Sequence, residues 1–95
     1  MKAIIAKMHV AEGKEDEFEK VALELAGQVA ANEPGNKLYK LGKTKDGQYF
    51  FVELYENDEA VAAHGTTDHM KAAGPKFAGV LAGRPELTVL DLVGD

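Results

Sequence analysis

The stretch "QYFFVELYE", residues 48–56, decides the fold. Side chains along a β-strand point alternately to its two faces. Apolar side chains fall on both faces of this strand, with Tyr49, Phe51 and Tyr55 on one and Phe50, Val52 and Leu54 on the other. An antiparallel strand with one face in water alternates apolar and polar residues instead. We therefore expect both faces to be covered.

Outside this strand, the sequence is typical of three more strands, two before it and one near the end of the chain, and of a long helix. β propensity predicts strands at residues 2–10 and 37–45, with a fourth at residues 86–93. Apolar residues from Phe18 to Val29 recur in steps of three and one, which makes one stripe of a helix. Two short motifs end these elements: Pro34-Gly35 stops the helix, and Asp46-Gly47 predicts a tight hairpin.

The chain after residue 56 is typical of short helices. Asn57 or Asp58 can cap the first helix, which Gly65 ends. Thr66 or Thr67 can cap the second. Pro75 interrupts the pattern, and we expect a separate helical piece to begin there.

The order of elements is β-α-β-β-α-β over a single domain, residues 1–95. This order predicts an α+β, ferredoxin-like fold with an antiparallel sheet and helices on one face. The helices can cover only that face, and the simplest cover for the other is the same sheet of a second copy. We expect a homodimer with the two sheets face to face. The alternative is a monomer with an apolar ligand groove.

Composition excludes several classes of protein. The chain has no cysteine, which rules out a disulfide scaffold and cysteine-ligated metal sites. The formal charge is −5 and no basic stripe is present, so nucleic acid is not an expected partner. No apolar run approaches the roughly 20 residues of a membrane span, and the start of the chain does not read as a signal peptide. We expect a cytoplasmic protein without membrane contact.

Two segments resemble the antibiotic biosynthesis monooxygenase family: "NEPGNKLYKL", residues 32–41, and "FFVELYENDEAVAAHGTTDHM", residues 50–70. The family pattern has an Asn-Glu-Pro-Gly turn, a strand with tyrosine, then glutamate, an aromatic residue, aspartate, alanine and two histidines. The matching positions are Asn32, Glu33, Pro34, Gly35, Tyr39, Glu53, Tyr55, Asp58, Ala60, His64 and His69. The resemblance covers nearly the whole chain and implies a dimeric α+β barrel.

The family includes cofactor-free quinol and polyketide monooxygenases, haem-degrading enzymes and isomerases of phosphorylated signalling sugars. Haem-degrading members share an asparagine on the first strand and a tryptophan in the pocket, and residues 2–10 have no asparagine while the chain has no tryptophan. The resemblance therefore implies a cofactor-independent monooxygenase that acts on a small aromatic or quinol-type substrate with O₂. An isomerase of a small carbonyl or sugar-phosphate compound and a non-catalytic small-molecule-binding dimer are the alternatives.

His64 and His69 are the candidate catalytic residues, and either could be the base. His64 shares a helical face with Ala60, and we expect its ring to bond Glu53 or the backbone. His69 would lie in the first turn of the next helix, where the positive helix end favours a neutral imidazole that can accept a proton. We expect a chiefly structural His64 and an exposed, chemically useful His69, both beside one pocket.

Six residues are candidate substrate contacts, namely Asn32, Tyr39, Phe51, Glu53, Tyr55 and Met70. The aromatic residues can line a dry pocket or simply pack in the core, and Asn32 can donate to an oxyanion or hold a turn. No flavin, nicotinamide or phosphate motif is present. Two histidines five residues apart are turned by about 140° on a helix, and spacing sets no third ligand. We expect no cofactor and no metal.

Overall fold

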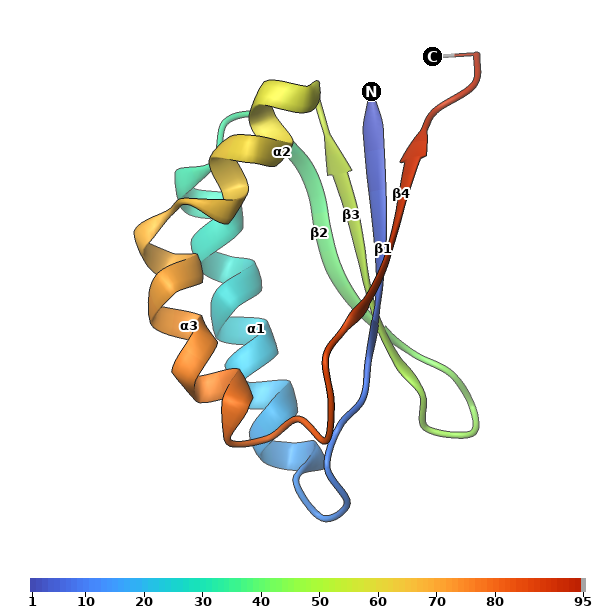
Figure 1. The fold of residues 1–95 in the computed structure, drawn as a ribbon, viewed down its shortest axis with the longest axis vertical. Coiled ribbons are helices and arrows are strands. Elements are labelled where there is room, and N and C mark those ends of the chain that lie inside the picture. The colour runs from blue at the N-terminus through green and yellow to red at the C-terminus, as the bar shows by residue number, and fades with distance from the viewer. Residues whose placement is uncertain (95) are drawn as a thin grey trace.

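A computed structural model describes residues 1–94. The elements are β1 (Lys2–Met8), α1 (Glu15–Asn32), β2 (Asn36–Lys43), β3 (Tyr49–Tyr55), α2 (Asp58–Gly65), α3 (Asp68–Ala78) and β4 (Glu86–Asp91). The strands form one antiparallel sheet in the order β2-β3-β1-β4. The helices lie on one face of this sheet (Figure 1). The predicted ferredoxin-like α+β arrangement is confirmed.

The ends of the two short helices follow the predicted caps. The Asn57 side chain accepts a hydrogen bond from the Ala60 amide at 2.9 Å and begins α2. The Thr67 hydroxyl accepts from the Met70 amide at 3.3 Å and begins α3. These bonds satisfy amides that have no partner within the helix.

The expected break at Pro75 is wrong, because α3 runs through this residue to Ala78. Proline removes one amide donor from a helix interior, which is unfavourable by itself. Tertiary packing offsets that loss: the Phe77 ring lies 5.9 Å from the Phe18 ring and 6.3 Å from the Phe51 ring, centroid to centroid. A continuous helix carries Phe77 into this aromatic cluster.

The two faces of β3 divide as its sequence predicts. Tyr49, Phe51 and Tyr55 are buried toward the helices, and Glu53 is buried among them. The opposite face carries Val52, which is 38% exposed, between two half-buried apolar neighbours. One face therefore belongs to the core of the chain, whereas the other is an apolar sheet surface.

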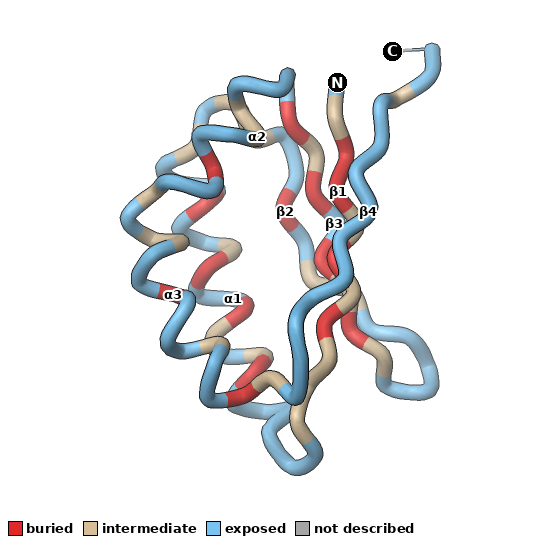
Figure 2. Tube along the Cα trace, viewed as in Figure 1, coloured by how far each residue is buried: buried red, intermediate tan, exposed pale blue. Residues whose placement is uncertain are grey.

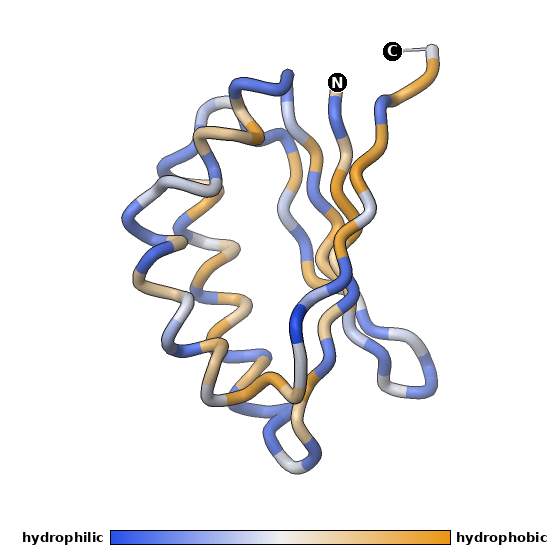
Figure 3. The backbone as a smooth tube through the Cα atoms, viewed as in Figure 1, coloured by the Kyte–Doolittle hydropathy of each residue, from blue (hydrophilic) through white to orange (hydrophobic). Residues whose placement is uncertain are grey.

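β4 is exposed along its whole length, and its apolar residues stand out in the hydropathy colouring (Figures 2 and 3). Its pairing with β1 places Leu87 opposite Ala6 and Val89 opposite Ile4, on the helix-facing side of the sheet. Leu87 and Val89 are nevertheless 63% and 55% exposed, because the helices pack against one another and the β2–β3 half of the sheet. In residues 1–94 no helix is long and apolar enough to cross a bilayer.

Candidate functional site

A cavity of about 850 Å³ lies between the inner face of the sheet and helices α2 and α3. We call it the sheet cavity. Its walls are mostly apolar and include Phe51 from β3, Met70 and Phe77 from α3, and Leu87 from β4. Tyr39, Glu53 and His64 supply polar groups to the lining. An apolar cavity with a few convergent polar groups is the usual form of a small-molecule site.

His64 lies at the polar part of this cavity and is 8% exposed. Its ring is held between two aromatic side chains, with centroids 5.5 Å from Tyr39 and 5.4 Å from Tyr55. Its Nδ1 lies 2.9 Å from each carboxylate oxygen of Glu33. A carboxylate at Nδ1 favours the tautomer with the proton on that nitrogen. The lone pair of Nε2 is then available to a molecule in the cavity.

Glu33 is the residue whose importance the sequence did not reveal. It caps the carboxyl end of α1, and its side chain is 7% exposed. Its carboxylate bonds both His64 and His69. In the sequence, this position appeared only as part of the Asn-Glu-Pro-Gly turn. The Asn-Glu-Pro-Gly motif was the available signal, but the direction of the Glu33 side chain depends on how α2 meets the turn.

The expected bond between Glu53 and His64 is wrong. Glu53 accepts a hydrogen bond from the Tyr55 hydroxyl at 2.7 Å, because the two side chains are neighbours on one face of β3. Burial raises the pKa of Glu53, and the nearby Glu33 carboxylate also raises it, while the Tyr55 bond and His64 lower it. Burial likewise raises the pKa of Tyr39 and of Tyr55, so both phenols stay protonated.

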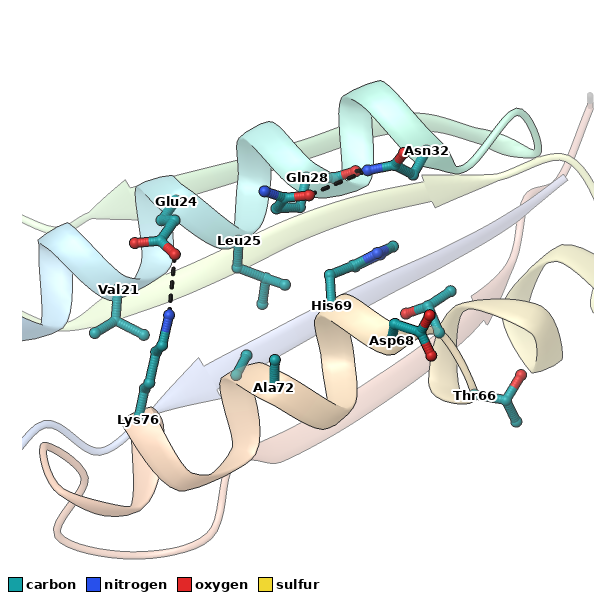
Figure 4. Close-up of a pocket in the computed structure, with 12 residues that line it drawn as sticks. Val21, Glu24, Leu25, Gln28, Asn32, Thr66, Asp68, His69, Ala72 and Lys76 are labelled. Carbon is teal, nitrogen blue, oxygen red and sulfur yellow. Dashed lines mark hydrogen bonds and ion pairs between the residues drawn. The ribbon is translucent and has the colours of Figure 1, made fainter.

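His69 faces a different space from His64. It lines a second cavity of about 650 Å³ between α1 and α3, which we call the helix cavity. Figure 4 shows His69 projecting from α3 toward α1. Its Nε2 bonds Glu33, and its side chain is 11% exposed. The expected exposed His69 is therefore wrong, because Glu33 draws the ring inward. The expectation that both histidines lie beside one pocket is wrong as well, since each lines a different cavity. The two histidines share a carboxylate, and His69 is not among the residues that line the sheet cavity.

The candidate substrate contacts separate in the same way. Tyr39, Phe51, Glu53 and Met70 line the sheet cavity. Asn32 instead lines the helix cavity, where its amide donates to the Gln28 backbone oxygen at 2.9 Å and to the Gln28 side chain at 3.1 Å (Figure 4). Tyr55 is fully buried behind Glu53 and His64 and is not a lining residue. Asn32 and Tyr55 are thus not placed to touch a molecule in the sheet cavity.

Glu33, His64 and His69 also form a group whose ligand atoms all lie within 4.8 Å of one another. Two histidines and one carboxylate are a known ligand set for divalent transition metals. Sequence spacing alone offered no third ligand for the histidine pair, and the fold supplies Glu33. In the structure the carboxylate is already bonded to both rings, so a metal would have to replace these two bonds.

Comparisons with known proteins agree with this architecture. Residues 1–76 match the family model of antibiotic biosynthesis monooxygenases. No curated protein matches the chain. A crystal structure from Caulobacter crescentus CB15, provisionally named an antibiotic biosynthesis monooxygenase, is 42% identical with a TM-score of 0.91, covering 97% of this chain and 89% of that one.

More distant solved structures share the fold. A Nitrosomonas europaea protein with the same provisional name is 21% identical with a TM-score of 0.90, covering 98% of this chain and 99% of that one. A third such protein, from Deinococcus radiodurans, is 14% identical with a TM-score of 0.86, covering 100% and 95%. Since the family model spans most of the sequence, the chain belongs to the antibiotic biosynthesis monooxygenase family.

Proposed function

We propose that this protein is a cofactor-independent monooxygenase that acts on a small aromatic substrate of the hydroquinone or phenol type. Family membership and the Caulobacter crescentus relative support a general monooxygenase-like function. The observation that carries the finer proposal is His64. It lines an apolar cavity, and Glu33 holds its Nδ1 so that Nε2 is free to accept a proton.

His64 would act as the general base. Its Nε2 removes a phenolic proton, and the resulting phenolate passes one electron to O₂. The superoxide and the substrate radical then combine at a ring carbon, and loss of water leaves the oxygenated product. For a hydroquinone, one oxygen atom enters a hydroxyquinone and the other leaves as water, so the substrate itself supplies the electrons. The Glu33 carboxylate stabilises the imidazolium that forms during the first step.

The remaining polar groups of the cavity would act on the oxyanion. Tyr39 keeps its proton because its pKa is raised, and its hydroxyl can therefore donate to a developing phenolate. Glu53 carries a raised pKa as well, and its protonated form is a second possible donor. The apolar walls exclude water, which strengthens these interactions.

We also propose that the protein works as a homodimer. The outer face of the sheet carries an apolar surface, whose exposed large members are Leu38, Val52 and Leu90. Exposed apolar surfaces of this kind commonly mark protein contacts. A second copy with its sheet against this one would cover the surface with the same residues from both sides.

Oxygen uptake tests the proposed reaction. Wild-type protein, analysed first for chromophores and metals, is mixed with 1,4-naphthohydroquinone in an oxygen electrode, above the rate of autoxidation. We expect protein free of flavin, haem and stoichiometric metal to consume O₂, and His64→Gln to abolish the catalysed part. His9→Gln, which changes a histidine on the surface, is the control.

Two results would favour other functions. A substrate that is converted without O₂ uptake would indicate an isomerase, and His64→Gln protein that loses only affinity would indicate a binding module. One metal ion per chain, lost in Glu33→Gln, would instead identify Glu33, His64 and His69 as ligands.

A further inference from the structure

Arg84 lies in the segment that leads into β4 and is a lining residue of the sheet cavity. It is the only arginine of a chain whose formal charge is −5. Its side chain is exposed, and within residues 1–94 no carboxylate pairs with it. The neighbouring carboxylate of Glu86 is bound to His9 instead. An apolar cavity thus has one unpaired cation in its lining.

Arg84 lies far along the sheet from the polar part of the cavity. Glu53 pairs with Ile4 on β1, and Glu86 pairs with Lys7, three residues further along the same strand. Three residues of a strand span about 10 Å. Because Arg84 comes two residues before Glu86, its backbone is at least on the order of 10 Å from the row that contains Glu53. The backbone that carries Arg84 and the row that contains Glu53 therefore lie toward different ends of the cavity.

The backbone on both sides of Arg84 is restrained. The Ala82 amide donates to the His9 carbonyl oxygen at 2.7 Å, and Leu81 forms a β-bridge with Val10. Pro85 follows Arg84 directly and restricts the backbone further. Because this backbone is already restrained, the segment loses less conformational entropy when Arg84 binds a ligand.

We propose that Arg84 binds a carboxylate of the substrate, and that the substrate is an elongated aromatic molecule with a hydroxyl group near His64 and a carboxylate at the far end. The guanidinium fork matches a carboxylate in geometry as well as charge. The apolar walls between the two ends suit a ring system of two or more fused rings. The role of His64 rests on the proposed function, whereas the contact with Arg84 does not.

In this proposal Arg84 is a specificity-determining residue. It lies outside residues 1–76, the part that matches the family model. The family match thus explains the histidines and the aromatic lining but not this cation.

Equilibrium binding of 6-hydroxy-2-naphthoate tests the proposal, because this probe carries a hydroxyl and a carboxylate at opposite ends of two fused rings. Its methyl ester is the matched neutral probe. Binding is measured by calorimetry at low and at high salt. We expect the acid to bind wild-type protein about tenfold more tightly than the ester, the order expected for one charge-assisted contact, and this preference to weaken at high salt.

The variants distinguish Arg84 from a general attraction to cations. Arg84→Gln should remove the preference for the acid while leaving ester binding unchanged, and Arg84→Lys should retain part of it. Lys45→Gln, in the hairpin between β2 and β3, removes one positive charge at an exposed position away from the cavity and should change neither. Equal binding of acid and ester to wild-type protein, no binding of either probe, or a preference that survives Arg84→Gln would overturn the proposal.

The outcome is separable from that of the proposed reaction. An acid preference that depends on Arg84, in a protein that consumes no O₂ with any hydroquinone, would support the carboxylate site and reject the oxygenase. Oxygen uptake with 1,4-naphthohydroquinone, together with no acid preference, would support the oxygenase and reject the carboxylate site.

Discussion

The Nδ1 of His64 lies 2.9 Å from both carboxylate oxygens of Glu33, although the two residues are 31 positions apart in the chain. Both side chains are about nine-tenths buried. A buried imidazole in this position depends on Glu33 for its orientation and its tautomer. The orientation of His64 is therefore set at the end of α1, not on the sheet.

Glu33→Gln should destabilise the protein and disturb His64. A glutamine replaces one carboxylate oxygen with an NH₂ group that cannot accept a hydrogen bond, and it removes the negative charge that both rings contact. We expect a loss of about 1–3 kcal/mol in the free energy of unfolding, measured by urea denaturation. Nitrogen-15 shifts should show His64 as the Nδ1–H tautomer in wild-type protein and as a mixture in the variant.

Glu86→Gln is the matched control for that change. It removes a carboxylate that also bonds a histidine, His9, but the pair lies on the surface. Exposed pairs of this kind contribute little to stability. If the two variants lose equal stability, Glu33 has no special part in the fold.

Variants of the two histidines should lose similar stability but differ in oxygen uptake. Both lose a bond to Glu33 when replaced, so His64→Gln and His69→Gln should each lower the free energy of unfolding by about 1–3 kcal/mol. Only His64 lines the sheet cavity, and we expect His64→Gln alone to abolish oxygen uptake. A His69→Gln protein that is as inactive as His64→Gln, at equal folded fraction, would place the base at His69.

Sequence reasoning located the elements well, because periodicity, caps and turns are local signals. Asn57 and Thr67 cap the helices as predicted, and both faces of β3 are apolar. Pro75 shows the limit of such signals: local propensity argues for a break, while the packing of Phe77 against Phe18 and Phe51 keeps the helix continuous.

Five of the eight predicted site residues line the sheet cavity, namely Tyr39, Phe51, Glu53, His64 and Met70, but the hydrogen-bond partner of His64 was not predicted. His64 does lie near Glu53, yet it bonds Glu33. Which carboxylate meets His64 depends on the approach of α2 to the turn after α1. That approach is a tertiary contact, and no pattern within the sequence reports it. The same reason kept Arg84 out of the predicted site, since the β-bridge between Val10 and Leu81 brings its segment to the cavity.

Gly35 allows that approach, and Gly35→Ala tests it. A Cβ at this position would lie 2.6 Å from the Cβ of Ala60 in α2. Backbone must move to relieve the clash, and we expect a loss of about 1–3 kcal/mol in unfolding free energy. Because the shift would carry α2 away from Glu33, the variant should also lose oxygen uptake.

Gly27→Ala is the control for Gly35→Ala. Gly27 lies within α1, and an added Cβ would meet nothing within 4 Å. Alanine is the better helix former, so this variant should gain up to about 1 kcal/mol. A Gly35→Ala protein as stable as Gly27→Ala would show that the contact with Ala60 yields without cost.

The raised pKa of Glu53 should make the stability of the protein depend on pH. This pKa is higher in the folded chain than in the unfolded chain, chiefly because of burial. The folded state therefore holds its proton to higher pH, and the stability associated with protonated Glu53 is lost as pH rises through the folded-state pKa. Glu53→Gln keeps an acceptor for Tyr55 and cannot ionise. Its stability relative to wild-type protein should rise as pH increases from 4 to 8 in urea denaturation. A difference that stays constant with pH would show that Glu53 does not titrate in this range.

The sheet surface predicts the oligomeric state. We expect wild-type protein at micromolar concentration to scatter light as a dimer, because Val52 and its apolar neighbours on the outer face gain from being covered. Val52→Asp places a charge at the centre of the proposed contact, and burying an unpaired charge is strongly unfavourable, so this variant should be a monomer. Leu23→Asp changes an apolar residue on α1 that is 60% exposed, and it should leave the dimer intact. A wild-type monomer, or a dimer that Leu23→Asp disrupts and Val52→Asp does not, would show that the outer face of the sheet is not the contact between copies.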